Sequence, residues 1–383
     1  MEKKWFQSSY RRNLVDMHIT DWDEKFLCEF DPKKYVDIVL RANIDTAQIY
    51  ANSHVGHCYW PTKTGHMHEG LKGRDILGEL IQLLHEKNIN VVIYYSLIFN
   101  NWAYENHPDW RIIIVDGKGA KGLGGGRYGV CCPNNTSYRD FTMAQIEELC
   151  KNYEFEGFWF DMTFWPTICY CSACKKRYSS EIGGEIPKIV NWEDPKWLKF
   201  QRKREEWLVE FASLVTSTAK KFKPSVSVTH QSAAFIRDWK WGASVNLARE
   251  MDYMAKDFFG DSLEQSFFTK LFYSLGKNLP FEFMTSRCDP NLREHTVTKS
   301  KELLEAQTFA SLANNAAFTF IDAIDPVGTL NKDVYELMGE IFKNTQQYEK
   351  YMGGKYCQDI GIYLSYESNF DLRENNKKVS DVQ

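Results

Sequence analysis

Gly157-Phe-Trp-Phe-Asp161 is an uninterrupted run of glycine and aromatic residues that ends on a carboxylate. A short apolar run of this kind is typical of a strand buried on both faces in a parallel sheet. Seven further runs of strand length alternate with stretches of helical period, at residues 13–18, 46–50, 91–95, 225–229, 251–259, 280–285 and 316–321. The alternation alone would fit a doubly wound sheet, but eight strands with polar ends predict an α/β fold of the (β/α)8 TIM-barrel type.

Local capping signals support the helical part of this pattern. Asp31 and Pro32 are residue types preferred at the N-cap and the first position of a helix, and they open an expected helix over 31–42. Further helices are expected over 74–86, 137–152, 195–222 and 297–312. Residues 117–129 are rich in glycine but lack the spacing of a phosphate-binding loop, so we expect a flexible surface loop there.

The barrel and its helices are expected to fill residues 1–350. Residues 351–383 are expected to form a linker and the first strand of a truncated or following C-terminal α/β domain. The reason is Asp359-Ile-Gly-Ile-Tyr-Leu-Ser365, which has the composition of a strand and precedes a polar stretch rich in lysine and asparagine.

Composition excludes several classes of partner. The chain has 47 basic and 51 acidic residues and no basic tail, so no nucleic-acid partner is expected. No stretch approaches the roughly 20 apolar residues of a membrane span, and no apolar run follows the N-terminal Met-Glu-Lys-Lys-Trp, so neither a membrane partner nor a secretory signal is expected. Ten cysteines in a chain of 383 residues predict reduced thiols and a cytoplasmic location.

The carboxyl ends of the strands are where a barrel of this type carries its active site. Asp161 stands at such an end, and cleavage of a glycosidic bond needs a second carboxyl group as acid/base. Glu282 is the first candidate because its two phenylalanine neighbours would raise its pKa, and Asp257 is the alternative. Any of these could instead be a hydrogen-bonded carboxylate at a strand end. His230 and Arg287 follow later strands and are candidate substrate-binding residues.

Four ordered segments between residues 10 and 165 resemble the family 29 α-L-fucosidases. His54-Val-Gly-His-Cys-Tyr-Trp-Pro-Thr62 resembles the His-Asp-Gly-Phe-x-x-Trp-Pro-Ser segment of that family. Arg74-Asp-Ile-Leu-Gly-Glu79, Tyr94-Tyr-Ser96 and Phe158-Trp-Phe-Asp161 follow at the expected distances. The whole chain is similar to the hypothetical glycosyl hydrolase 6 family, which lies near the family 151 α-L-fucosidases. Met162 departs from family 29, which has glycine there.

The resemblance implies a retaining exo-glycoside hydrolase that releases a terminal sugar, with α-L-fucose expected, from a fucosylated oligosaccharide or glycoside by double displacement. It implies no catalytic cofactor, and leaves open a homo-oligomer in a longer protein. A β-galactosidase-like barrel hydrolase and a non-catalytic carbohydrate-binding barrel remain alternatives. Asp161 would be the nucleophile, and the implied substrate-binding residues are His18, His54, His57, Trp60, Tyr94 or Tyr95, and Trp159.

Cys169-Tyr-Cys-Ser-Ala-Cys174 brings three thiols close together in the loop after Asp161. Three thiolates at this spacing can reach one zinc ion, which usually takes four ligands, and Cys132 or Cys131 could be the fourth. The expected zinc would be structural, since a full set of thiolates leaves no open position for hydrolysis. The alternative is a group of reduced thiols that pack the loop.

Overall fold

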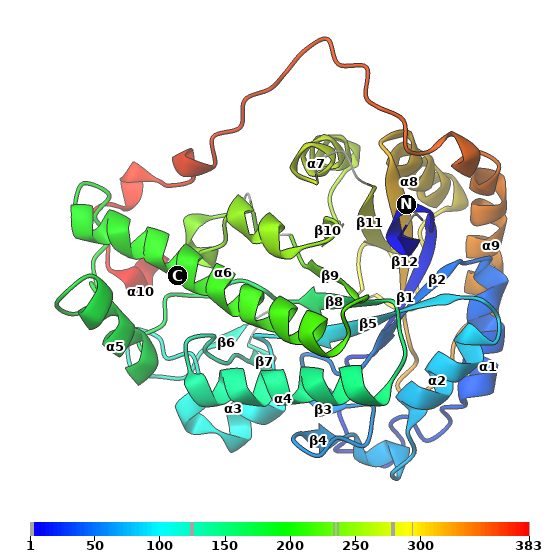
Figure 1. The fold of residues 1–383 in the computed structure, drawn as a ribbon, viewed down its shortest axis with the longest axis horizontal. Coiled ribbons are helices and arrows are strands. Elements are labelled where there is room, and N and C mark those ends of the chain that lie inside the picture. The colour runs from blue at the N-terminus through cyan, green and yellow to red at the C-terminus, as the bar shows by residue number, and fades with distance from the viewer. Residues whose placement is uncertain are drawn as a thin grey trace.

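Eight parallel strands form the centre of the molecule (Figure 1). The structure is a computed structural model that describes residues 4–122, 126–232, 234–235, 237–276, 280–292 and 294–382. The sheet has the order β10-β11-β12-β1-β2-β5-β8-β9, and a parallel bridge between Gln231 and Ala255 joins its two edges. The strands are β1 (Arg11–Asp16), β2 (Thr46–Tyr50), β5 (Asn90–Ser96), β8 (Gly157–Asp161), β9 (Ser227–His230), β10 (Ala255–Asp257), β11 (Phe281–Ser286) and β12 (Ala316–Ala323).

Helices surround this ring. Asp31 caps the first one by accepting hydrogen bonds from the backbone of Lys33 and Lys34, as its position before Pro32 predicts. The α-helices are α1 (Pro32–Val39), α2 (Ile76–His85), α3 (Asn101–Asn106), α4 (Thr136–Asn152), α5 (Ser172–Glu181), α6 (Pro195–Phe222), α7 (Ser262–Leu275), α8 (Lys301–Ala313), α9 (Lys332–Gln346) and α10 (Val379–Val382).

Shorter elements decorate the loops. The two-residue strands are β3 (His57–Cys58), β4 (His66–Met67), β6 (Lys121–Gly122) and β7 (Tyr128–Gly129). The 3-10 helices are η1 (Trp5–Gln7), η2 (Leu40–Ala42), η3 (Glu69–Leu71), η4 (Pro108–Trp110), η5 (Trp239–Trp241), η6 (Val245–Glu250), η7 (Glu349–Tyr351), η8 (Tyr366–Ser368) and η9 (Leu372–Glu374).

The expected barrel is confirmed, because all eight expected strands are present and the ring closes between β9 and β10. The edges of a doubly wound sheet would instead remain apart. Within the described residues, no helix combines the length and the apolar character needed to cross a bilayer.

The C-terminal segment lies outside the barrel, and its assignment to a linker and a further domain stays a prediction. Residues 359–365 form no strand, and the side chains of Ile360, Ile362 and Tyr363 are exposed. In Figure 1 this part of the chain leaves α9, arches away from the barrel and returns on the side of α5 and α6. There Val379 is fully buried and the backbone of Lys377 accepts a hydrogen bond from Val190. The apolar residues of 359–365 have no partner strand in the described chain, so their strand-like composition alone does not form one.

Candidate active site

Asp161 is the last residue of β8, and its carboxylate points into the barrel on the same face as Trp159. Its Oδ2 atom accepts the phenolic proton of Tyr94, and its Oδ1 atom accepts the backbone N–H of Met162 at 2.7 Å. Met162 has a φ of 56°, in the left-handed region that favours glycine. The glycine of the family 29 segment therefore corresponds to a real backbone requirement, which methionine meets here at some cost in strain.

His54 lies beside Asp161 in a defined tautomer. The Nδ1 atom of His54 is 2.8 Å from the hydroxyl of Ser96, and that hydroxyl donates its single proton to the carbonyl of Phe99 at 2.8 Å. Ser96 must therefore accept from His54, so Nδ1 carries the proton and Nε2 has a free lone pair. Nε2 is 3.8 Å from Oδ2 of Asp161. Burial, and then the charge of His18, hold the pKa of His54 well below its usual value, so the ring is neutral.

Rings from three strands and two loops build a wall around Asp161. Tyr94 stacks between Tyr50, at a centroid distance of 3.9 Å, and Trp159, at 5.7 Å. The ring of His18 lies 4.1 Å from that of His54, with Asp16 bound to its Nδ1 atom. Within the described chain, neither Nε2 of His18 nor Nε1 of Trp159 has a hydrogen-bond partner. Buried polar groups are rarely left unpaired, so these two atoms are available to polar groups of a ligand.

Asp257 supplies a second carboxyl group from the end of β10. Its Oδ1 atom accepts a hydrogen bond from the side-chain amide of Gln231 at 2.9 Å. Burial raises the pKa of Asp257, although the neighbouring Lys256 opposes the shift. Burial also raises the pKa of Asp161 to about 7, and the charge of Asp257 is the second cause of that rise. The two carboxyl groups therefore interact across the same end of the barrel.

Glu282 does not lie at this end of the barrel. It is the second residue of β11, and its carboxylate is bound by the guanidinium of Arg12 and, at 2.7 Å, by the amide of Gln48. Gln48 is level with Gly157, four residues and about 13 Å along the strand before Asp161. Arg12 and Glu282 are both almost completely buried. This buried ion pair argues against the acid/base role that the sequence suggests for Glu282.

Several other expected substrate-binding residues lie away from Asp161. Trp60 is fully buried, and its indole N–H bonds to Glu148 at 3.2 Å, so it offers no surface to a sugar. The hydroxyl of Tyr95 donates to Gln145 on α4, because the pleat turns Tyr95 outward where Tyr94 points inward. The structure therefore places Trp60 and Tyr95 against α4 and does not bring them to Asp161.

His230 and Arg287 are also fully engaged with other groups. His230 is buried between Thr163 and Thr216 on α6, at 3.1 and 3.0 Å, so its ring faces the helix layer and not the barrel. Arg287 is buried and binds Asp322 through Nε at 2.7 Å. His230 is thus structural, and Arg287 is placed as an ion-pair partner at the ends of β11 and β12.

His57 belongs to a separate cluster. Its Nε2 atom lies 3.4 Å from Asp21, whose other oxygen is 2.8 Å from Nε2 of His66. Burial lowers the pKa of His57 to about 4. The structure therefore does not bring His57 to Asp161.

Three residues that the sequence did not single out do reach the site. Asp16 and Tyr50 end β1 and β2, so the rule that polar groups at strand ends form the site could have found them. Tyr128 comes from the glycine-rich segment expected to be a flexible surface loop, yet it is buried with its ring 5.3 Å from His54. Residues 123–125 of that segment lie outside the described residues.

The thiols expected to cluster do so in the structure. The sulfur atoms of Cys132, Cys169, Cys171 and Cys174 all lie within 4.8 Å of one another, and all four residues are buried. Cys131 turns the other way, with its sulfur 3.9 Å from the carbonyl of Asn100. Of the two candidates for the fourth thiol, the structure thus brings Cys132 to the cluster.

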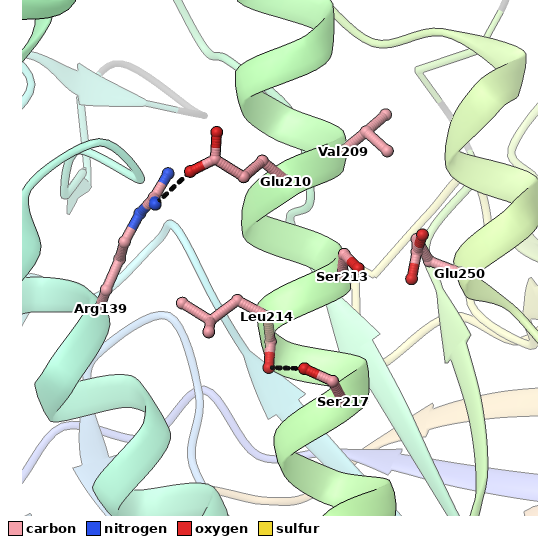
Figure 2. Close-up of a pocket in the computed structure, with 7 residues that line it drawn as sticks. All are labelled: Arg139, Val209, Glu210, Ser213, Leu214, Ser217 and Glu250. Atoms are coloured by element: carbon pink, nitrogen blue, oxygen red, sulfur yellow. Dashed lines mark hydrogen bonds and ion pairs between the residues drawn. The ribbon is translucent and has the colours of Figure 1, made fainter.

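A hollow of about 490 Å³ opens on the outside of the barrel (Figure 2). It lies along α6, and Arg139 from α4 pairs with Glu210 at 2.5 Å on its border. No strand end reaches it, so its position does not match that of a barrel active site. Its lining residues are Arg139, Val209, Glu210, Ser213, Leu214, Ser217 and Glu250.

A closed ring of parallel strands that presents two carboxyl groups at its carboxyl end is an arrangement on which glycosidic bonds are hydrolysed. Residues 31–162 match the family model described as Hypothetical glycosyl hydrolase 6. The α-L-fucosidase isoenzyme 2 of Paenibacillus thiaminolyticus superposes with a TM-score of 0.76 and 22% identity, over 90% of this chain and 50% of that one. A comparison with curated proteins finds no match.

Two further solved structures share the fold. A family 29 α-L-fucosidase from Bacteroides thetaiotaomicron, solved as a trapped covalent intermediate with 2-fluoro-fucosyl fluoride, has a TM-score of 0.53 and 17% identity over 86% of this chain and 63% of that one. A β-galactosidase from Rahnella sp. R3 has a TM-score of 0.66 and 15% identity over 90% and 57%. The chain spans about half to two thirds of the length of these structures. These structures show the shared barrel fold, and the family match confirms the resemblance of residues 31–162 to the hypothetical glycosyl hydrolase 6 family.

Proposed function

We propose that the protein is a retaining exo-glycoside hydrolase that releases terminal α-L-fucose, with Asp161 as nucleophile and Asp257 as acid/base. The observation that carries this proposal is the unequal support of two interacting carboxyl groups. Asp161 accepts two hydrogen bonds, from Tyr94 and from the backbone of Met162, and these favour its anionic form. The carboxyl group of Asp257 accepts a side-chain hydrogen bond from the neutral amide of Gln231, and burial favours its protonated form.

The two carboxyl groups divide the reaction between them. In the first step the Asp161 carboxylate attacks the anomeric carbon while the Asp257 carboxyl group donates its proton to the departing glycosidic oxygen. The product is a glycosyl ester of Asp161 and a free alcohol. In the second step the Asp257 carboxylate takes a proton from water, and the resulting nucleophile displaces Asp161 at the same carbon. The sugar leaves with its original anomeric configuration, and both carboxyl groups return to their starting states.

The surrounding rings would bind and orient the sugar. The free lone pair on Nε2 of His54 would accept a hydrogen bond from a sugar hydroxyl, and Nε2 of His18 and Nε1 of Trp159 offer further polar contacts. The aromatic wall of Tyr50, Tyr128 and Trp159 offers apolar ring surface to the C–H groups of a sugar ring, with Tyr94 stacked between Tyr50 and Trp159. The low polarity of these rings suits the methyl group of a 6-deoxy sugar.

The resemblance of residues 54–62 and 158–161 to the fucosidase segments, and the fucosidases among the solved structures, support fucose as the sugar. The trapped covalent intermediate of the Bacteroides enzyme supports a double displacement on this fold. A β-galactosidase shares the barrel as well, so galactosides belong in the same assay.

A panel of nitrophenyl glycosides, assayed with the wild type and with Asp161→Gly and Asp257→Gly, tests the proposal. Wild type is expected to release nitrophenol from the α-L-fucoside. Added azide should rescue both variants and give glycosyl azides of opposite anomeric configuration, inverted for Asp161→Gly and retained for Asp257→Gly. Turnover of the β-galactoside alone would overturn fucose, and binding of free sugars without any turnover would identify a non-catalytic barrel.

A further inference from the structure

We propose that Cys132, Cys169, Cys171 and Cys174 hold one structural zinc ion. Cys132 comes from the loop before α4, and the other three come from the loop between β8 and α5 and from the first turn of α5. The sulfur of Cys132 is 3.5 Å from those of Cys171 and Cys174. That separation is far beyond the roughly 2.05 Å of a disulfide bond. It is close to the edge of about 3.8 Å that a tetrahedron of sulfurs has around zinc at a Zn–S distance near 2.3 Å.

The groups around the sulfurs suit thiolates. The backbone N–H of Asn134 points at Cys132 at 3.4 Å, its side-chain amide at Cys174 at 3.4 Å, and the N–H of Cys171 at Cys169 at 3.5 Å. Hydrogen bonds of this kind orient the ligands of a metal site and stabilise their negative charge. Cys171 is the N-cap of α5 and Cys174 lies in its first turn, where the partial positive charge of the helix end favours an anion.

Two guanidinium groups lie behind the amide that faces the cluster, and both also pair with Glu210. Four thiolates around one Zn²⁺ leave a net charge of −2. The guanidinium groups of Arg177 and Arg139 bind the side-chain oxygen of Asn134, at 3.0 and 3.4 Å, while the amide of Asn134 faces Cys174. The positive charges thus reach the cluster through one polarised amide. Metal-free, the same four thiols would be a buried group of weakly bonding sulfurs with no covalent link between them.

The proposed ion would fasten two loops beside the candidate active site. The loop that begins at Met162, directly after Asp161, reaches the cluster at Cys169, and Cys132 ties it to the segment before α4. With four sulfur ligands the ion has no open position for substrate, so its role is to hold the loop. This inference stands on the cluster geometry alone and does not depend on the proposed glycosidase activity.

Metal analysis of the purified full chain tests the proposal. Wild type produced with zinc in the medium is expected to carry one zinc per chain after gel filtration, and Cys171→Ser and Cys132→Ser are expected to lose it. Cys131→Ser is the matched control, because Cys131 is the equally buried neighbour that faces Asn100. The control should keep its zinc and its Tm, while loss of zinc should lower Tm by several degrees.

A second measurement covers variants that fail to fold. Wild type exchanged into cobalt should show a sulfur-to-cobalt charge-transfer band and the intense visible bands of a tetrahedral cobalt–thiolate site, and a mercurial reagent should release one metal ion as four thiols react. Wild type without stoichiometric metal and without the cobalt–thiolate bands would overturn the proposal. Loss of zinc in Cys131→Ser, with retention in Cys132→Ser, would overturn the assignment of the fourth ligand.

Discussion

Tyr94 donates its phenolic proton to Oδ2 of Asp161, whereas the adjacent Tyr95 donates to Gln145 on the outside of the barrel. This contact joins the third and fourth strands of the barrel at the proposed nucleophile, and it favours the anionic form of Asp161. Two neighbouring tyrosines with the same chemistry thus have opposite surroundings.

Replacement of Tyr94 by phenylalanine should raise the pKa of Asp161, because the hydrogen bond that lowers it is removed. We expect the acid limb of the kcat/KM profile to move about 1–2 pH units upward. The measurement is a pH series on the fucoside, with Tyr95→Phe as the control that should leave this limb in place. An unmoved limb in Tyr94→Phe would show that Asp161 does not control it.

Asp161 should also make the folded protein less stable as the pH rises. Its folded pKa is about 7 against an ordinary value of 3.8, so its contribution to stability is full below pH 3.8 and is lost as the pH rises through 7. Asp161→Asn lacks this titration. Relative to the wild type, the free energy of unfolding of the variant should therefore rise by about 3 kcal/mol between pH 4.5 and 7.5. Denaturant melts at the two pH values measure this, and a constant difference would contradict the raised pKa.

Glu282→Gln should destabilise the protein by about 3–5 kcal/mol, because it leaves the buried guanidinium of Arg12 without its counter-charge. The fraction that remains folded should retain kcat within a few-fold of wild type. Urea melts and active-site-normalised kinetics separate the two effects, with Asp257→Asn as the comparison that should lose kcat without a comparable loss of stability. If Glu282→Gln instead removed the basic limb of the pH profile, Glu282 and not Asp257 would be the acid/base.

His54 and His230 give a matched pair of histidine variants. His54→Gln should lower kcat/KM roughly 10- to 100-fold, because it disturbs a group held 3.8 Å from Asp161 by Ser96. His230→Gln should lower Tm through its lost contacts with Thr163 and Thr216, with little change in kcat/KM of the folded enzyme. Equal losses of kcat/KM in both variants would refute the separation of their roles.

The strands could be predicted from the sequence because the cause is local. A buried parallel strand needs an uninterrupted apolar run, and 157–161 or 316–321 show it without reference to any other residue. Residues 359–365 form no strand in the described chain, and their assignment to a further domain stays a prediction, because an apolar run becomes a strand only where a neighbour pairs with it.

The site was only partly predictable, because the direction of a side chain and its level along the barrel depend on residues that are distant in the sequence. Glu282 was correctly expected in a buried strand, but its position at the start of β11, opposite Arg12, depends on the register of distant strands. His230 ends its strand as Asp161 does, yet its side chain points to α6. Tyr128 reaches His54 only because a long loop folds back over the barrel. The spacing of residues along the sequence does not indicate any of these three placements.

The two carboxyl groups stand on strands that are paired to unequal extents. One bridge pair, Gln231 and Ala255, closes the sheet, with flanking backbone bonds from Ser232 to Ala255 and from Asp252 to Val228, whereas β1 and β12 share six paired residues. Fewer ladder bonds lower the free energy of local opening. We therefore expect the junction between β9 and β10 to open more readily than the junction between β1 and β12. Asp257 lies on β10, and its amide partner Gln231 belongs to the bridge that closes the ring. Asp161 lies on β8, which shares five paired residues with β5. In the proposed mechanism, a displaceable Asp257 can donate its proton to leaving groups of different shapes. Asp161 attacks the same carbon atom in every substrate and therefore needs a fixed position.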